Sequence, residues 1–293
     1  MTKTILTIAM FLPACGAYAA SSGAQFLNID VSARAVGMGS AYTAAADGAG
    51  SIGYNPAGLL GGGGVEAALS HTRWLMESSH DFAAVAFPLK NLRAGVGYSR
   101  FAAGEMTARD ASGAVAGSFS NTDQAVSLNL AGRVKGLGLG AGVKYIASSL
   151  GGENAATFAA DLGVSAGLGR VTLGLAARNI GPGLKYLDQA DPLPLAVSVG
   201  ALAHIVPGFG LSADVTRLVH DDRTVLSIGS EYALLPALSL RAGYLAGRTT
   251  AADDNRGFSA GAGVNLAGAS LDYALTPYGE LGSAQKITVR KRF

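Results

Sequence analysis

The chain has 293 residues, of which 14% are charged and 49% hydrophobic, with 42 glycines, a single cysteine and a net charge of +2. This balance supplies no strong field to attract nucleic acid or an acidic partner. The charged fraction is low for a soluble domain, yet the mature chain has no run of about 20 apolar residues, the length that a transmembrane helix needs. Two classes remain: a glycine-rich soluble all-β protein, or a membrane β-barrel.

The first 19 residues are expected to be a signal peptide. Lys3 supplies positive charge, residues 5–12 form the apolar stretch, and residues 17–19 (AYA) are a small-x-small cleavage site. The competing interpretation is that residues 12–16 (LPACG) act as a lipobox and that Cys15 is lipidated. Without Cys15, the exported chain has no cysteine and needs no disulfide in an oxidising compartment.

Residues 20–64 form a segment of their own, because they show no sustained alternation and are rich in alanine and glycine. Residues 33–46 favour one or two short helical turns. Asn55-Pro56 is a turn signal, and the glycines of residues 61–64 indicate a flexible joint.

Residues 65–293 read as a series of strands in which large apolar residues alternate with small or polar ones. In residues 137–145 one face is Leu, Leu, Ala, Val, Tyr and the other is Gly, Gly, Gly, Lys. Most of the segments are about as long as a tilted strand that crosses a bilayer. We expect strands at 65–73, 80–89, 92–101, 123–134, 137–149, 155–168, 171–180, 193–206, 209–219, 224–234, 238–247, 257–266, 270–276 and 285–293.

The connections between these strands alternate in length. Every second connection is a two-residue turn, whereas the others are mostly longer, with only residues 220–223 short. Short turns at one rim and long loops at the other are typical of a membrane barrel. We therefore predict an all-β fold: a transmembrane antiparallel β-barrel of about 14 strands in the bacterial outer membrane, with both barrel ends on the turn side.

The two faces of the strands support this fold. An outward Arg or Lys at the bilayer centre costs about 2–4 kcal/mol, so charges are expected in the lumen. Aromatic residues fall near the two rims, as interfacial girdles do. The terminal aromatic Phe293 is expected to be the barrel-assembly signal. The predicted lumen-facing charges are Arg93, Lys144, Asp161, Asp214, Glu231, Arg241 and Asp272.

The sequence offers no constellation for catalysis. The four histidines are scattered without a carboxylate in register, and no nucleophile-elbow sequence is present. The Gly-x-Gly pattern of residues 136–142 continues as strand alternation and is not followed by a helix. We therefore predict no enzyme activity, no catalytic residue and no cofactor or metal site. The expected partners are outer-membrane lipid and the barrel-assembly machinery.

Four pieces of the N-terminal stretch resemble the start of the PorV/PorQ family of outer-membrane proteins, which is related to FadL-type channels. They are residues 26–29 (FLNI), 33–41 (ARAVGMGSA), 44–47 (AAAD) and 55–59 (NPAGL). The motif residues are Arg34, Gly37, Met38, Gly39, Asp47, Asn55, Pro56, Ala57 and Gly58.

The resemblance implies a fourteen-strand barrel in which residues 20–64 fold into the lumen as a plug. Physics favours that position, because a barrel of this size otherwise leaves a wide opening. Arg34 and Asp47 would then pair with lumen charges. The alternative is a loose periplasmic tail.

Two functions are compatible with such a barrel. The first is a secretion-associated, type IX-like role in which the outer loops dock exported cargo or a translocon component. The second is FadL-like transport of a hydrophobic compound, which enters from the loop side. The predicted lumen lining is mostly Gly, Ser, Ala and charges, the wrong lining for a greasy ligand, and this favours the first role. The loop residues expected to contact a partner or the outer leaflet are Trp74, Leu75, Met76, Leu184, Tyr186 and Leu187.

Overall fold

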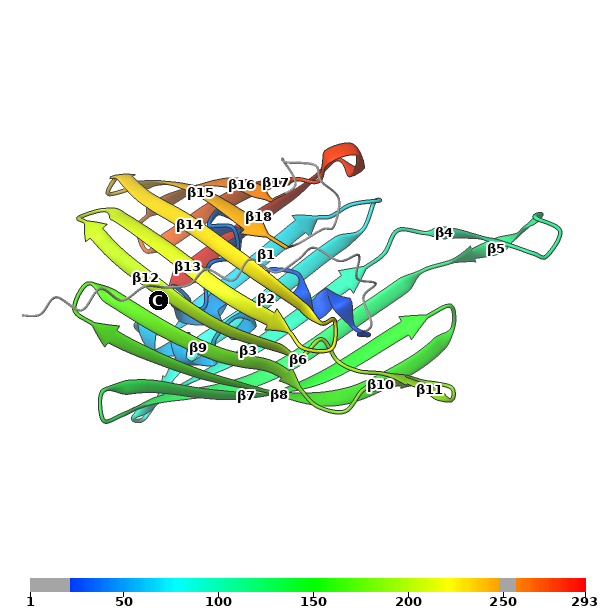
Figure 1. Cartoon of the computed structure of the whole chain (residues 1–293), viewed down its shortest axis with the longest axis horizontal. Helices are drawn as coiled ribbons and strands as arrows, with labels where there is room; N and C mark the ends of the chain where they lie inside the picture. The colour runs from blue at the N-terminus through cyan, green and yellow to red at the C-terminus, as the bar shows by residue number, and fades with distance from the viewer. Residues whose placement is uncertain (1–21, 248–256) are drawn as a thin grey trace, which may run out of the picture.

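The computed structural model describes residues 22–247 and 257–293; the predicted signal peptide and Cys15 lie outside them. Within the described residues, fourteen antiparallel strands close into one barrel (Figure 1), which confirms the predicted fold class. Each barrel strand lies within three residues of its predicted bounds. The strands are β1 (Glu66–Arg73), β2 (Ser79–Leu89), β3 (Leu92–Ala102), β6 (Asn121–Val134), β7 (Leu137–Leu150), β8 (Glu153–Leu168), β9 (Val171–Ile180), β12 (Ala196–Val206), β13 (Phe209–Leu218), β14 (Arg223–Leu235), β15 (Leu238–Ala246), β16 (Phe258–Leu266), β17 (Ala269–Pro277) and β18 (Ser283–Arg292).

Two loops contain hairpins that the alternation did not predict. Strands β4 (Met106–Arg109) and β5 (Val115–Phe119) pair with each other and project beyond the barrel at its loop end (Figure 1). Strands β10 (Leu184–Tyr186) and β11 (Gln189–Asp191) form a second, shorter hairpin. Pairing within a loop satisfies backbone groups that the barrel leaves unpaired. A short 3₁₀ turn, η4 (Gly279–Leu281), lies in a third loop.

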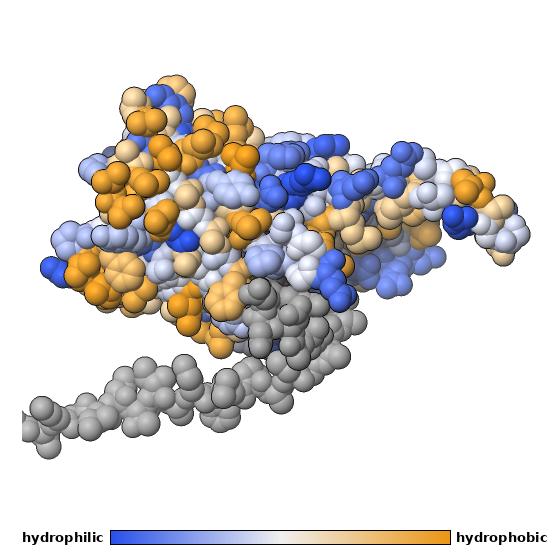
Figure 2. Space-filling view, turned by 90° about the horizontal axis from the view of Figure 1, so that it is seen from above, coloured by the Kyte–Doolittle hydropathy of each residue, from blue (hydrophilic) through white to orange (hydrophobic). Residues whose placement is uncertain are grey.

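The barrel wall has an apolar outside and a polar inside. Adjacent residues of β12 illustrate the alternation, since Val197 is 37% exposed and Ser198 only 2%. Apolar side chains are spread over the barrel face seen in Figure 2. A closed, even-stranded antiparallel barrel with this exterior is the form of bacterial outer-membrane proteins, which confirms the predicted location.

Aromatic side chains pair across neighbouring strands at both rims. Phe209 and Tyr232 lie at the turn end, with ring centroids 6.2 Å apart. Toward the loop end, ring pairs on neighbouring strands have centroids 5.2 and 4.8 Å apart; they are Tyr145–Phe158 and Tyr244–Phe258. Such rings suit the membrane–water interface.

The wall is irregular at one point well away from the turns, between β8 and β9. The register shifts between Ala160 and Leu162, and Asn179 has a φ of 62°. The amide of Asn179 donates to Asp161 Oδ1 at 2.8 Å instead of joining the ladder. Beyond Ile180 the chain leaves β9 for the β10–β11 hairpin.

The N-terminal segment, residues 22–64, lies inside the ring of strands (Figure 1). It consists of short helical turns because its glycines and alanines provide no long apolar face. Helix α1 contacts β15 to β18, η2 contacts β1 to β3, and η3 contacts β3 and β6 to β8. No helix of the described residues is long and apolar enough to cross a membrane. The turns are η1 (Gln25–Asn28), α1 (Ala33–Gly37), η2 (Gly48–Gly53) and η3 (Pro56–Gly61).

Candidate functional site

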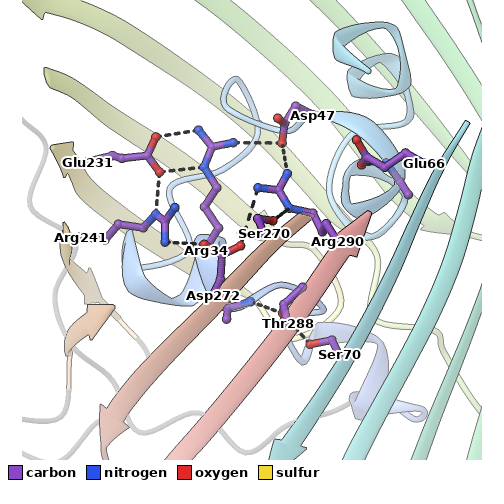
Figure 3. Close-up of polar contacts among 12 residues, drawn as sticks. Arg34, Asp47, Glu66, Ser70, Glu231, Arg241, Ser270, Asp272, Thr288 and Arg290 are labelled. Atoms are coloured by element: carbon purple, nitrogen blue, oxygen red, sulfur yellow. Dashed lines mark hydrogen bonds and ion pairs between the residues drawn. The ribbon is translucent and has the colours of Figure 1, made fainter. Parts of the chain in front are cut away.

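Charged side chains join the N-terminal segment to the wall in the turn half of the barrel (Figure 3). Arg34 donates from Nε and Nη2 to the two carboxylate oxygens of Glu231, both at 2.8 Å, and from Nη1 to Asp47 at 3.0 Å. Arg241 donates to the same Glu231 at 2.6 Å and to Asp272 at 2.7 Å. Positive and negative groups alternate through this network, so each partly buried charge has an opposite neighbour.

Asp47 is the carboxylate that the N-terminal segment supplies to this network. It also accepts hydrogen bonds from Arg290 at 3.2 Å and from the hydroxyl of Tyr42 at 3.0 Å. Burial opposes ionisation of Asp47, but Arg34 and Arg290 outweigh that effect and hold the pKa of this carboxyl below its usual value. Asp47 is therefore ionised at neutral pH and binds two arginines.

Asp214 of the wall binds the backbone of the segment. Its Oδ2 accepts from the amides of Tyr42 and Thr43, at 2.8 and 2.7 Å. Nearby, Asn55 Nδ2 donates to the carbonyls of Thr43 and Val164, while its Oδ1 accepts from the amide of the residue two positions on. Asn55 thus caps η3 and binds the wall with one side chain.

The remaining motif residues lie at close backbone contacts. Gly39 has a φ of 61°, and a Cβ there would lie 2.5 Å from the amide nitrogen of Tyr244. Gly140 of β7 faces Pro56 and Ala57, and its Cβ would lie 2.3 Å from the Ala57 nitrogen. Only residues without a side chain allow these approaches. Gly37, Met38 and Gly58 likewise pack tightly, against Arg241 and Gly261, against Gly229 and against Ala46.

The predicted lumen charges all face the interior, in separate groups. Glu231, Arg241 and Asp272 belong to the network of Arg34. Lys144 forms an ion pair with Asp161 at 2.9 Å, beside the irregularity of β8 and β9. Of the two remaining charges, Asp214 binds the segment backbone as described, and Arg93 donates to the carbonyl of Gly64 at 3.0 Å. At the turn end, the amide of the exposed Phe293 donates to the carbonyl of Val65 at 2.9 Å.

At the loop end, the segment and the wall enclose a cavity of about 470 Å³. Its lining is mostly apolar and aromatic, with polar groups on the β6–β7 side. It consists of Ala24, Gln25, Phe26, Ile29, Trp74, Phe101, Asn121, Asp123, Ser148, Leu150, Leu184 and Tyr186. An apolar cavity with a few convergent polar groups is the usual form of a small-molecule site.

A second cavity, of about 40 Å³, lies deeper and shares Phe26 and Ile29 with the first. Leu27, Val31, Ile52 and Phe82 give it an apolar lining, and Lys144 borders it. A third cavity, of about 130 Å³, also borders Ile29 and has a mixed lining that includes two arginines, Arg178 and Arg223. The apolar cavities therefore follow one side of the N-terminal segment.

Sequence analysis missed the source of this apolar surface. The strands alone supply a small-residue and polar lining, as predicted, but the N-terminal segment adds Phe26 and Ile29 and the β10 loop adds Leu184. The available signal was the apolar cluster FLNI of residues 26–29 in a segment otherwise dominated by small residues. Among the described residues, no group of three His, Cys, Asp or Glu side chains is placed to hold a metal ion.

Comparison with known proteins identifies the fold through structure alone. No family model and no curated protein matches the sequence. The toluene transporter TbuX of Ralstonia pickettii has 14% identity and a TM-score of 0.60, over 84% of this chain and 94% of that one. The toluene transporter TodX of Pseudomonas putida has 13% identity and a TM-score of 0.61, over 82% and 92%. A FadL homologue of Pseudomonas aeruginosa has 14% identity and a TM-score of 0.58, over 87% and 96%.

These findings correct the predicted secretion role. The structural neighbours are FadL-type hydrocarbon channels and not secretion partners, so the docking interpretation is wrong. The loop residues give a physical reason for the error. Trp74, Leu184 and Tyr186 line the cavity, and Leu184 is only 1% exposed, whereas Met76 and Leu187 are exposed. Much of the apolar loop surface thus points inward and not toward a protein partner.

Proposed function

We propose that this protein is a FadL-like transporter of hydrophobic compounds across the outer membrane, without enzymatic activity. The observation that carries the proposal is the loop-end cavity of about 470 Å³ with its apolar and aromatic lining. A hydrophobic solute gains about 25 cal/mol for each Å² of apolar surface that leaves water. A solute that enters the loop-end cavity gains this free energy at the end of the barrel at which the solute arrives.

Passage beyond this cavity requires a change in the N-terminal segment. We propose that residues 20–64 act as a plug of the barrel formed by residues 65–293. Support comes from the contacts of η2, η3 and α1 with opposite parts of the wall. A solute in the loop-end cavity passes the smaller cavity below Phe26 and then meets η2. The plug shifts there, or the solute leaves through the wall near the irregularity of β8 and β9.

A blocked cavity tests the transport role. Ile29 borders both apolar cavities, so Ile29→Trp places a large ring between them. We expect uptake of a radiolabelled monoaromatic hydrocarbon by cells that express the variant to fall by at least fivefold. Leu266→Trp is the matched control, because Leu266 is exposed on the barrel exterior, where an indole ring is well tolerated. Equal uptake by both variants and the wild type contradicts the proposal.

Removal of residues 24–60 tests the plug. The barrel without this segment is expected to show a larger single-channel conductance in planar bilayers, because the lumen loses its filling. The folded state of the variant is checked by its heat-modifiable migration in gels. An unchanged conductance of a folded variant contradicts the plug.

The proposal extends to the role of the C-terminal residue and to the family of the chain. Phe293 is proposed to be the barrel-assembly signal, and deletion of this residue is expected to slow insertion into the outer membrane; a normal yield argues against it. Membership of the PorV/PorQ family rests on residues 26–59 alone.

A further inference from the structure

We propose that the loop-end cavity selects hydrophobic compounds that carry a protonated amine. This inference rests on the proposed function and specifies the substrate class of the same site. It follows from three features of the lining: its hydrogen-bond acceptors, its charge and its aromatic rings.

On the side of β6, β7 and β10, the polar side chains of the cavity donate hydrogen bonds toward one carboxylate, that of Asp123, whereas the amide of Gln25 on the opposite side donates to Ser22 and Asp221. The hydroxyl of Tyr186 donates to Ser148 Oγ, and Ser148 donates to Asp123 Oδ1. The amide of Asn121 also donates toward Asp123, at 3.4 Å. The hydroxyl protons of Tyr186 and Ser148 are donated to other groups of the protein. The oxygens of Asp123 therefore remain to accept hydrogen bonds from a ligand.

Asn121 supplies a second acceptor without a partner. Its side-chain oxygen is buried and receives no hydrogen bond in the described part of the chain. A buried acceptor without a donor costs about 1–3 kcal/mol, and a ligand N–H group relieves this cost once the Asn121 amide turns toward the cavity. An ammonium group has three donors and no acceptor, which fits Asn121 and Asp123 together.

The charge that the cavity lining carries is negative. Asp123 is the charged residue among those that line the cavity, and no Lys, Arg or His lines it. Asp123 has no ion-pair partner among the described residues, in contrast to the paired carboxylates near Arg34. Burial raises the pKa of Tyr186, the hydrogen bond with Ser148 lowers it, and the carboxylates of Asp123 and Asp191 raise it, so both carboxylates oppose a negative charge at this hydroxyl.

The apolar part of the lining is rich in aromatic rings. Phe26, Trp74, Phe101 and Tyr186 come from the N-terminal segment, the first loop, β3 and β10. Aromatic faces attract cations by about 0.5–2 kcal/mol, and the effect grows as water is excluded. The same rings bury an alkyl or aryl body, so both halves of an amphiphilic amine find a matching surface.

The cavity of about 130 Å³ on the other side of Ile29 provides a contrast in charge. Arg178 and Arg223 line it, together with Asp30, Thr43 and Tyr54. The basic residues near the N-terminal segment are thus kept out of the loop-end cavity. This separation favours an amine at the loop end over a carboxylate.

The experiment uses three probes of the same shape: 4-phenylbutylamine, 4-phenylbutan-1-ol and 4-phenylbutanoate. The purified protein in detergent is titrated with each probe, and binding is followed by fluorescence. Trp74 is the only tryptophan of the chain and lines the cavity, so its emission reports occupancy. We expect the amine to bind the wild type at least tenfold more tightly than the alcohol, and the carboxylate to bind most weakly.

Asp123→Asn preserves the shape of the side chain and removes its charge. This variant is expected to bind the amine and the alcohol within about twofold of each other. Asp110→Asn is the control, since Asp110 is exposed in the β4–β5 hairpin outside the cavity and should retain the tenfold preference. Asn121→Ala, which removes the unpaired acceptor, should weaken the amine more than the alcohol and provides a second variant if Asp123→Asn does not fold.

The outcomes separate the two proposals. If the alcohol binds the wild type as tightly as the amine, or if Asp123→Asn keeps the preference, amine selectivity is wrong while transport of hydrophobic compounds stands. If no probe changes the emission of Trp74 and uptake is also insensitive to Ile29→Trp, the proposed function itself is wrong.

Discussion

The two ends of the N-terminal segment bind to the barrel in different ways. Residues 31–64 are attached by Arg34, Asp47 and Asn55 and by close backbone contacts at Gly39 and Gly140. Residues 22–30 are attached by single hydrogen bonds near their ends: the amide and the hydroxyl of Ser22 donate to Asp221, at 3.1 and 2.7 Å, the amide of Gly23 donates to the carbonyl of Pro192 at 2.9 Å, and Lys286 donates to the carbonyl of Asp30. Phe26 packs in a small cluster with wall residues, and both apolar cavities border this outer part.

The difference indicates a division of roles within one segment. A segment that closes a lumen must be held firmly in place. Ion pairs of alternating charge and close packing of backbone against backbone both provide such contacts. Binding a solute requires unfilled apolar space, which close packing would remove. Under the proposed function, the inner part is the fixed closure and the outer part is one wall of the ligand cavity.

The largest effect is expected from a clash in the inner part. Gly140→Val introduces a Cβ within 2.3 Å of the Ala57 backbone, and backbone cannot yield as a side chain does. We expect a loss of about 3 kcal/mol or more, visible as a lower midpoint of heat-induced unfolding on gels. In Gly167→Val the new Cβ meets nothing within 4 Å, so a change of at most about 0.5 kcal/mol is expected. Equal midpoints for the two variants contradict close packing at η3.

A smaller effect is expected when the charge network loses its central cation. Arg34→Met leaves Glu231 and Asp47 each with fewer partners and should cost about 2 kcal/mol. Planar-bilayer recordings should also show more frequent openings, since the closure is weakened. Arg217→Met removes an arginine from an exposed ion pair and serves as the control, with a midpoint shift near zero. The same shift in both variants argues that the network adds no stability.

Acid should weaken the inner part in a defined direction. The folded state lowers the pKa of Asp47, so its contribution is present above the unfolded pKa of about 4 and is lost as the pH falls through the folded value. Asp47→Asn lacks this contribution at every pH. The difference in unfolding midpoint between wild type and variant should therefore be constant from pH 7 to about pH 5 and shrink below about pH 4. A difference that grows on acidification contradicts the assigned direction.

The smallest effect is expected in the outer part. Ser22→Ala removes the hydroxyl that donates to Asp221 and accepts from Gln25 Nε2, while the amide bond to Asp221 and the Gln25 bonds to Asp221 remain, so the cost should be about 1 kcal/mol. Its unfolding midpoint should lie closer to that of the wild type than the midpoint of Arg34→Met. A reversed order would mean that the outer part carries the stability of the segment, and the division of roles would be wrong.

Particular elements show how far the sequence could predict this structure. The strands were predictable because a period of two reports a surface that is apolar on one side, and the lumen charges followed from the cost of charge in lipid. Those charges could be placed on a face, but their partners could not be identified. Glu231 and Arg34 are far apart in the chain, and nothing in either local sequence specifies the other.

The cavity was beyond prediction for a related reason. Phe26, Trp74, Phe101 and Leu184 belong to four separate elements, and each has an ordinary local explanation. Trp74 and Leu184 were expected to face outward as loop tips. They line an internal cavity because the loops fold over the barrel end, which local periodicity does not encode.

The sequence by itself determined the barrel, its strand number and the polarity of its two faces, because each strand must satisfy lipid on one side and the lumen on the other. Only the tertiary structure decided which residues meet inside. The N-terminal segment lies inside the ring, and its charged side chains find partners on several different strands, which come together only once the barrel has closed.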